Sequence, residues 1–63
     1  MIGIKMLVDV KTLFGVVLKN NTYRIGKFTF GVVNKLNKNG SFTTKHGSKS
    51  ITFSPNQFKQ III

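Results

Sequence analysis

Basic and aromatic side chains stand together in two stretches of the chain, "YRIGK" and "FTTKHGSK". Lysine and arginine attract phosphate groups and displace the counterions that surround a nucleic acid. Aromatic rings on a sheet give unpaired bases a flat surface on which to stack. The two stretches therefore predict a nucleic-acid-binding site, and its candidate residues are Tyr23, Arg24, Lys27, Lys45, His46 and Lys49.

Two of these side chains have a second interpretation. Tyr23 is equally compatible with an exposed stacking surface and with a partly buried place in the core. His46 precedes Gly47 in a predicted turn, where we expect a solvated side chain; the alternative is a contact with phosphate or a base. We assign five of the six phenylalanines to the core, and these are Phe28, Phe30, Phe42, Phe53 and Phe58.

The charge of the chain favours an acidic partner. Ten Lys and Arg residues stand against one acidic residue, so the formal net charge is +9. A field of that sign attracts polyanions, although it says nothing about the fold. The partners that it favours are a nucleic acid, an anionic membrane surface or an acidic protein.

Enzymatic chemistry has few residues to draw on. General acid–base catalysis usually needs a carboxylate or histidine with a supporting partner, and this chain has only Asp9 and His46, far apart in sequence. Neither Ser48 nor Ser54 has an evident base to activate it. Cysteine is absent, and two scattered side chains do not make a metal site. We therefore expect no catalytic residue, no metal and no cofactor.

No targeting or membrane segment is expected. The first apolar run carries Lys5 and Asp9, unlike a signal peptide. The uncharged stretch "TLFGVVL" is far shorter than the roughly 20 residues that cross a bilayer. These patterns predict an intracellular protein without a membrane partner, in the cytoplasm, the nucleoid or, if the source is viral, the host cell.

Alternating apolar and polar residues predict a single small β-rich domain over residues 1–63. Asn39-Gly40 is the strongest hairpin signal in the chain. We expect a mostly β fold with a short C-terminal helix, in which four to five antiparallel strands form a curved sheet or small barrel. The predicted strands cover residues 2–11, 12–19, 22–33, 41–45 and 49–53.

The last nine residues are predicted to be helical. Ser54 is a good N-cap, Pro55 suits the first helical position and Gln57 completes a capping box. Three successive isoleucines cannot all face one small core from a helix. A core of this size is usually stabilised further by disulfides, a metal or oligomerisation, and cysteine is absent, so we expect a homodimer. The alternative is that the isoleucines cap their own sheet. The predicted interface residues are Phe58, Ile61, Ile62 and Ile63.

The stretch "KHGSKSITFSPNQFKQI", residues 45–61, resembles the signature of the positive cofactor 4 family of transcriptional coactivators, which bind single-stranded DNA. "YRIGK" resembles the opening of that family's domain. The resemblance implies a dimer of curved antiparallel sheets that holds unpaired DNA. It also implies that Lys45 and Lys49 contact the DNA backbone and that Tyr23 and Lys27 lie on the exposed sheet face. The matching positions are Lys45, Gly47, Lys49, Ile51, Phe53, Pro55, Gln57 and Phe58.

The sequence favours a non-enzymatic nucleic-acid-binding module that prefers single-stranded DNA, with RNA as a second ligand, acting as an accessory protein in transcription or replication. A second hypothesis is a small SH3-like β-barrel protein that docks on an acidic surface of another protein, as a viral modulator of a host enzyme would. A third is a structural protein whose lysines pack against encapsidated nucleic acid.

Overall fold

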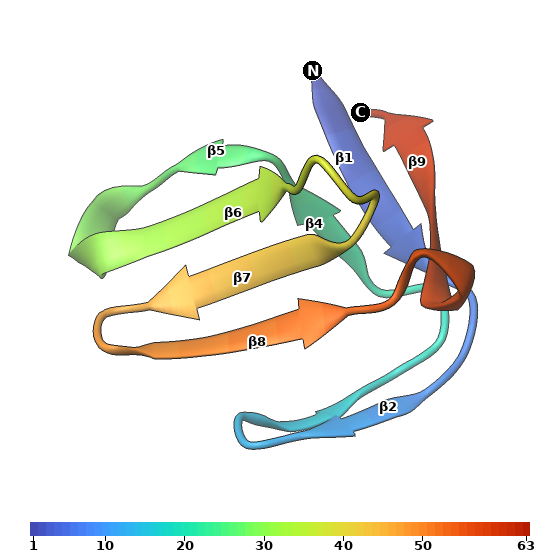
Figure 1. The fold of residues 1–63 in the computed structure, drawn as a ribbon, viewed down its shortest axis with the longest axis horizontal. Coiled ribbons are helices and arrows are strands. Elements are labelled where there is room, and N and C mark those ends of the chain that lie inside the picture. Colours follow the sequence, from blue (N-terminus) through green and yellow to red (C-terminus); the bar gives the residue numbers. More distant parts are fainter.

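The computed structural model describes residues 1–63, and strands account for 57% of the chain. The strands form three antiparallel sheets (Figure 1). The predicted fold class, mostly β and antiparallel, is confirmed, although the strands are shorter and more numerous than the four to five expected. The elements are β1 (Ile2–Met6), β2 (Val10–Thr12), β3 (Gly15–Val17), β4 (Thr22–Arg24), β5 (Gly26–Lys27), the 3-10 turn η1 (Thr29–Gly31), β6 (Val32–Leu36), β7 (Phe42–His46), β8 (Lys49–Phe53), the 3-10 turn η2 (Pro55–Gln57) and β9 (Phe58–Ile62).

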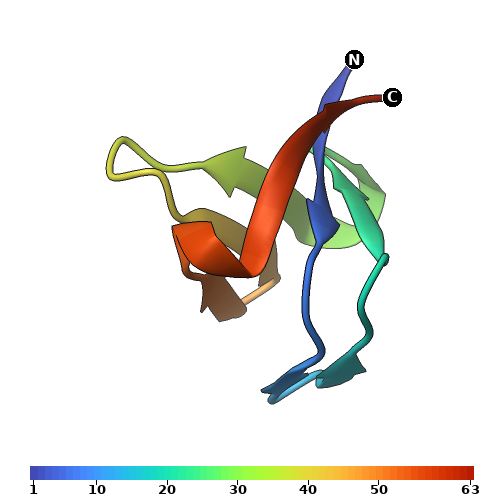
Figure 2. The ribbon, with the colours of Figure 1, turned by 90° about the vertical axis from the view of Figure 1, so that its right-hand side faces the viewer.

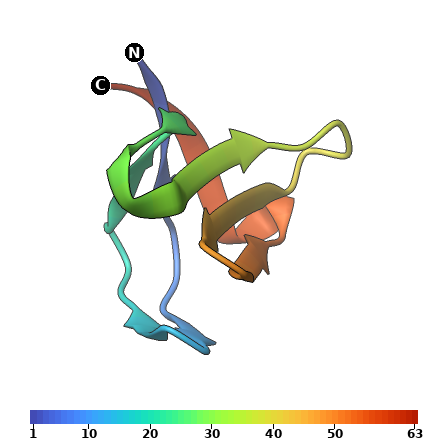
Figure 3. The same cartoon turned by 90° about the vertical axis from the view of Figure 1, so that its left-hand side faces the viewer.

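Two of the sheets share one bent segment. The terminal sheet has the strand order β4–β1–β9, and the four-stranded sheet has the order β5–β6–β7–β8. The chain passes from β4 to β5 at Ile25, where Gly26 with φ of 151° adopts a backbone conformation that side chains disfavour. The turn η2 joins β8 to β9, but these strands do not pair, so the sheets do not close into a barrel. Figures 2 and 3 show the four-stranded sheet crossing the steeper strands of the terminal sheet, with both chain ends side by side beyond it.

One hydrophobic core receives side chains from all three sheets. Successive residues of a strand point to opposite faces, so Ile4 and Met6 of β1 point inward while Lys5 points away from the core. Burying a large apolar side chain contributes about 1.5–3 kcal/mol. The core assignments of Phe42, Phe53 and Phe58 are confirmed. The buried set is Ile4, Met6, Val17, Phe42, Ile51, Phe53 and Phe58.

The β2–β3 hairpin projects from the bottom of the molecule in Figure 1. Its turn is held by the Thr12 side chain, whose Oγ1 donates to the Gly15 carbonyl at 2.7 Å and accepts from the Phe14 amide at 3.1 Å. The Asp9 carboxylate accepts a hydrogen bond from the Lys19 amide at 2.6 Å and closes the base of the hairpin. The exposed apolar side chains of the hairpin include Leu13, Val16 and Leu18.

The run 22–33 was predicted as one strand, and this prediction is wrong because the run folds back on itself. The Phe28 amide donates to the Val32 carbonyl at 2.8 Å. Phe30 and Gly31 follow each other with φ of 64° and 75°, and two left-handed residues in succession reverse the chain so that β5 pairs with β6. Phe30 is 97% exposed, so its assignment to the core is wrong as well. Phe28 is half-buried.

The helix predicted for the last nine residues is limited to the single turn η2. The Ser54 amide donates to Gln57 Oε1 at 2.9 Å, and the Gln57 amide donates to the Ser54 carbonyl at 2.9 Å, so the helix-start signal was recognised correctly. At Phe58 the backbone becomes extended, and β9 pairs with β1 from Met6↔Phe58 to Ile2↔Ile62. The pairing satisfies the backbone groups of β1, and β-branched isoleucines favour strands, so tertiary contacts outweigh the local helix signal.

The residues predicted for a subunit interface separate into two groups. Phe58 is buried in the core, so its side chain is not available to a partner. Ile62 and Ile63 are exposed and Ile61 is partly exposed, all at the end of β9.

Both helical elements are turns of three residues, and the structure contains no helix that could cross a bilayer.

Candidate nucleic-acid interface

The side of the four-stranded sheet that faces away from the core is basic, and we call it the outer face. Two cross-strand rows define it. In one row, Lys27 of β5 lies opposite Val33 of β6, which in turn lies opposite Lys45 of β7 and then Ser50 of β8. Since neighbouring strands lie about 4.8 Å apart, Lys27 and Lys45 leave the backbone roughly 10 Å from each other. The second row is Lys35, Thr43 and Thr52.

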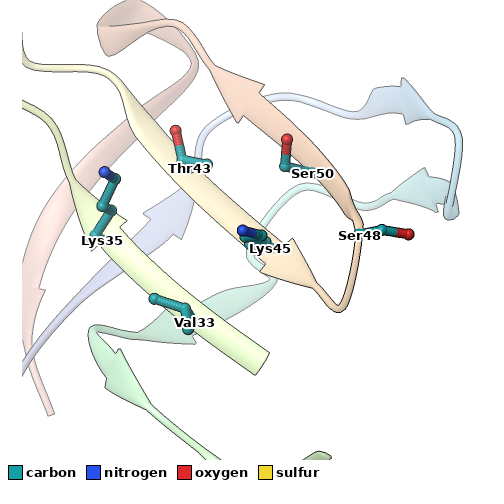
Figure 4. Close-up of a pocket in the computed structure, with 6 residues that line it drawn as sticks. All are labelled: Val33, Lys35, Thr43, Lys45, Ser48 and Ser50. Atoms are coloured by element: carbon teal, nitrogen blue, oxygen red, sulfur yellow. The ribbon is translucent and has the colours of Figure 1, made fainter. Parts of the chain in front are cut away.

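A shallow hollow of about 460 Å³ occupies the middle of the outer face. Figure 4 shows two lysine side chains, Lys35 on β6 and Lys45 on β7, rising from the same side of the sheet, with hydroxyl groups of β7 and β8 beside them. Ammonium groups attract phosphate, and hydroxyl groups donate hydrogen bonds to phosphate oxygens. The hollow therefore has the chemistry of a phosphate contact surface. Its lining residues are Val33, Lys35, Thr43, Lys45, Ser48 and Ser50.

Hydrogen bonds fix the hydroxyl groups of the second row. Thr43 Oγ1 and Thr52 Oγ1 lie 3.1 Å apart across β7 and β8. Asn37 Nδ2 donates to Thr43 Oγ1 at 2.8 Å and to Ser41 Oγ at 3.0 Å, from the loop that follows β6. This network ties the loop between β6 and β7 to the sheet.

Buried polar contacts support the outer face from beneath. Thr44 Oγ1 donates to Asn34 Oδ1, and both residues are buried on the core side of the sheet. Asn34 Nδ2 donates to the Arg24 carbonyl at 2.8 Å, at the bend between β4 and β5. Because a buried polar group without a partner is costly, these bonds hold β5, β6 and β7 in the register that aligns Lys27, Lys35 and Lys45.

Phe30 stands in the turn η1 between β5 and β6, at one end of the four-stranded sheet. Its side chain is 97% exposed, and its backbone occupies the left-handed region that a bulky residue rarely adopts. The Gly31 carbonyl accepts from the Gly47 amide at 3.3 Å, so this turn lies against the turn between β7 and β8. An exposed ring in such a strained position is a candidate for a contact with a ligand.

Of the six predicted contact residues, Lys27 and Lys45 lie together on the outer face. His46 and Lys49 pair at the turn end of β7 and β8 and belong to the opposite side, as the alternation of a strand requires. The ring centroids of His46 and Phe14 lie 4.7 Å apart, so His46 contacts the tip of the β2–β3 hairpin. His46 is exposed, as expected.

Arg24 and Tyr23 lie outside the outer face. The guanidinium of Arg24 stands 5.1 Å from the centroid of the Phe28 ring, a cation–π distance. Tyr23 packs on the core, with its ring centroid 5.8 Å from that of Phe42 and 6.0 Å from that of Phe53. Burial raises the pKa of the Tyr23 phenol above its ordinary value, against the opposing effect of a hydrogen bond with Asn21. Of the two interpretations left open for Tyr23, the structure favours the partly buried one.

Sequence reasoning missed Lys35 on the outer face and the exposed ring of Phe30 in the adjoining turn. It also missed the uncharged residues that line the hollow, which are Val33, Thr43, Ser48 and Ser50. Lys35 follows Val33 by two positions, so a strand over "VVNKL" would have placed both on one face. Recognising that strand required knowing that the chain reverses at Phe30 and Gly31. The "FG" pair was the only local sign of such a turn.

The electrostatic balance of the surface follows from composition. The single acidic side chain, Asp9, lies at the base of the β2–β3 hairpin, where it accepts the Lys19 amide. No carboxylate therefore neutralises the lysines of the outer face, and their combined field is positive.

No family model, no curated protein and no solved structure matches this chain. The positions that resemble the positive cofactor 4 family form a strand, a turn and a strand, with Lys45 near the end of β7, Gly47 in the turn and Lys49 at the start of β8. The segment after η2 continues as β9 and not as the predicted helix.

Proposed function

We propose that this chain is a non-enzymatic module that binds unpaired nucleic acid across the outer face of its four-stranded sheet. The observation that carries the proposal is the projection of Lys27, Lys35 and Lys45 from one face without an acidic neighbour. The turn between β5 and β6, at one end of this sheet, adds the exposed ring of Phe30. The lysines would contact phosphates. The ring would stack on a base, which requires a strand whose bases are not already paired and stacked in a duplex.

Single-stranded DNA is the favoured ligand, with RNA as the second. The preference for DNA is supported by the resemblance of residues 45–61 to the positive cofactor 4 family. Such a module would act inside the cell, or inside the host cell of a virus, as an accessory protein in transcription or replication.

Fluorescence anisotropy with a short labelled oligothymidylate across a salt series tests the proposal. For single strands, log affinity falls with log salt by roughly 0.7 per phosphate contacted. The double variant Lys35→Ala/Lys45→Ala should therefore bind more weakly and show a slope smaller by about 1.4. A duplex of the same length should bind more weakly than the single strand.

A matched control is available on the hairpin. Lys11→Ala/Lys19→Ala removes the same charge from exposed positions away from the outer face and should leave the slope nearly unchanged. All four lysines are exposed, and surface substitutions usually change stability by no more than about 0.5 kcal/mol, so both variants should melt like the parent. Equal slopes in the two double variants would show that binding is not localised to the outer face.

One observation favours a second function, the binding of an acidic protein surface. The β2–β3 hairpin exposes apolar side chains between lysines, with Val16 directly opposite Lys11. Apolar contacts surrounded by complementary charge are typical of protein interfaces. Absence of oligonucleotide binding in low salt would contradict the nucleic-acid proposal and leave this second function as the better one.

A further inference from the structure

Strand β9 has one free edge. It pairs with β1 alone, at the end of the order β4–β1–β9. The Ile63 amide donates to the Met1 carbonyl at 2.7 Å, and the Leu7 amide donates to the Gln57 carbonyl at 2.8 Å, so the odd-numbered residues of this segment turn their backbone groups toward β1. Because these groups alternate along a strand, the N–H and C=O of Gln60 and Ile62 point to the free edge.

The side chains beside this edge are apolar and uncovered. Ile62 is 89% exposed and Ile2, its partner across the two strands, is 56% exposed. A hollow of about 360 Å³ lies there, lined by Ile2, Gln60, Ile61 and Ile62. Figures 1 to 3 show this end of the terminal sheet projecting past the four-stranded sheet, which leaves it uncovered. Proteins usually protect such edges with charges, proline or bulges, and Lys59 is the only charged residue of β9.

We propose that two copies of this chain pair through β9, antiparallel, about a two-fold axis at Ile61. Gln60 of one copy then forms the backbone hydrogen bonds with Ile62 of the second copy, and Ile61 stands opposite its own symmetry mate. The result is a six-stranded sheet that runs continuously through both copies and covers the exposed face of Ile62. A two-fold axis is the commonest way to close a self-complementary patch.

The position of the axis follows from hydrogen-bond parity, burial and charge. The backbone N–H and C=O groups on the free edge belong to even-numbered residues, so a register satisfies them only if it pairs even-numbered residues with each other. Such registers have their two-fold axis at residue 60, 61 or 62. An axis at Gln60 requires Phe58 to pair with Ile62, but Phe58 lies buried directly after η2. An axis at Ile62 engages only the last residues of the strand.

Charge is a second argument against the axis at Gln60. Lys59 already lies opposite Lys5 within one copy, and like charges directly opposite are destabilising. An axis at Ile61 places the two Lys59 residues four positions apart along the paired strands, about 14 Å, which exceeds the Debye length of about 8 Å at physiological salt. An axis at Gln60 would halve that offset.

The small core of the chain is a further reason to expect a stabilising interface. Seven buried apolar side chains form the whole core, and no cysteine is present to supply a disulfide. A second copy presents an edge whose hydrogen-bonding groups match those of β9 by symmetry. An unrelated chain would need its own edge with the same spacing of these groups. The proposal is independent of nucleic-acid binding, since β9 contributes nothing to the outer face.

Cysteine cross-linking tests the register directly, because the chain contains no cysteine. In the proposed sheet, residue 61 forms a non-hydrogen-bonded pair with itself, with a Cα separation of about 4.5 Å that a disulfide accepts. Under mild oxidation, Ile61→Cys should give a disulfide-linked dimer on a non-reducing gel. Lys59→Cys lies on the same face but opposite residue 63, and it should give at least tenfold less. Denaturant should abolish the difference.

Sedimentation of the unmodified chain gives a second, independent readout. A dimer should form with rising concentration and should strengthen with salt, because each copy carries a net charge of +9 and salt screens their repulsion. This dependence is opposite in sign to that of oligonucleotide binding, so failure of one proposal is distinguishable from failure of the other. Ile62→Lys, at an exposed position, should leave the circular dichroism unchanged and shift the chain to monomer. A monomer at all concentrations in high salt, or Lys59→Cys cross-linking as well as Ile61→Cys, overturns the proposal.

Discussion

Replacing Phe30 by glycine separates the two roles that this residue can have, in folding and in binding. The side chain is 97% exposed, so removing it costs almost no buried apolar area. Its φ of 64° lies in the left-handed region, which costs an L-residue roughly 1–2 kcal/mol and glycine nothing. Glycine also raises the conformational entropy of the unfolded chain, which lowers folding stability by about 0.5–1 kcal/mol. Phe30→Gly should therefore leave stability unchanged or raise it by up to about 1.5 kcal/mol.

Binding should respond in the opposite direction. Stacking on an aromatic side chain contributes about 1–3 kcal/mol per base, which corresponds to roughly a 5- to 150-fold loss of affinity for a single strand. Thermal melting followed by circular dichroism measures the first effect, where 1 kcal/mol corresponds to about 4–8 °C in a domain of this size. Anisotropy titration with oligothymidylate measures the second.

Two further variants make the test decisive. Phe30→Asn keeps a side chain that tolerates the left-handed conformation and should behave like Phe30→Gly in both assays. Leu13→Asn removes an exposed apolar side chain from the hairpin tip and should change neither measurement by much. If Phe30→Gly lowers the melting temperature by several degrees, the ring packs against the protein and the description of the turn is wrong. If stability is kept and affinity is unchanged, Phe30 is not a stacking surface.

Two other substitutions probe the interior. Thr44→Val should destabilise the chain by about 1–3 kcal/mol in urea unfolding, because it leaves the buried Asn34 Oδ1 without its donor; the control Thr52→Val, at an exposed position, should change stability far less, and equal losses would contradict the buried role. Burial raises the pKa of the Tyr23 phenol in the folded state above the unfolded value of 10.0. The contribution of the neutral phenol to folding stability is therefore fully present below pH 10 and is lost as pH rises through the folded pKa. Melting temperatures measured across this alkaline range should therefore fall less steeply for Tyr23→Phe than for the parent chain, and parallel curves would refute the assignment.

Period-two alternation predicted the β class and the inner positions of several strands, because alternation reports which face of a strand is buried. Phe42 and Phe53, assigned to the core, lie there at alternate positions of β7 and β8. The same rule failed at Phe30, since alternation assumes an extended chain and the backbone is left-handed at this residue. The outer face was only half predicted, because Lys35 joins it through a strand that exists only after that reversal.

The C-terminal segment shows a different limit. The capping box of Ser54 and Gln57 is a local signal, and the local turn that it specifies is present. Whether a helix continues depends on what lies beside the chain, and here the edge of β1 takes the segment as a strand. Three successive β-branched residues were the one sign in the sequence that favoured the strand.

The pairing of β1 with β9 also sets the order in which the molecule can assemble. In the four-stranded sheet, β5 pairs with β6, β6 with β7 and β7 with β8, so each pairing closes a short loop. In contrast, Ile2 pairs with Ile62 and Met6 with Phe58, across nearly the whole sequence. Since long loops close more slowly than short ones, the four-stranded sheet can form while β1 still lacks one of its neighbours. On a ribosome, Ile4 and Met6 must wait for β9 to emerge before their strand is paired on both sides, and this interval is when the chain most needs protection from association with other unfinished chains.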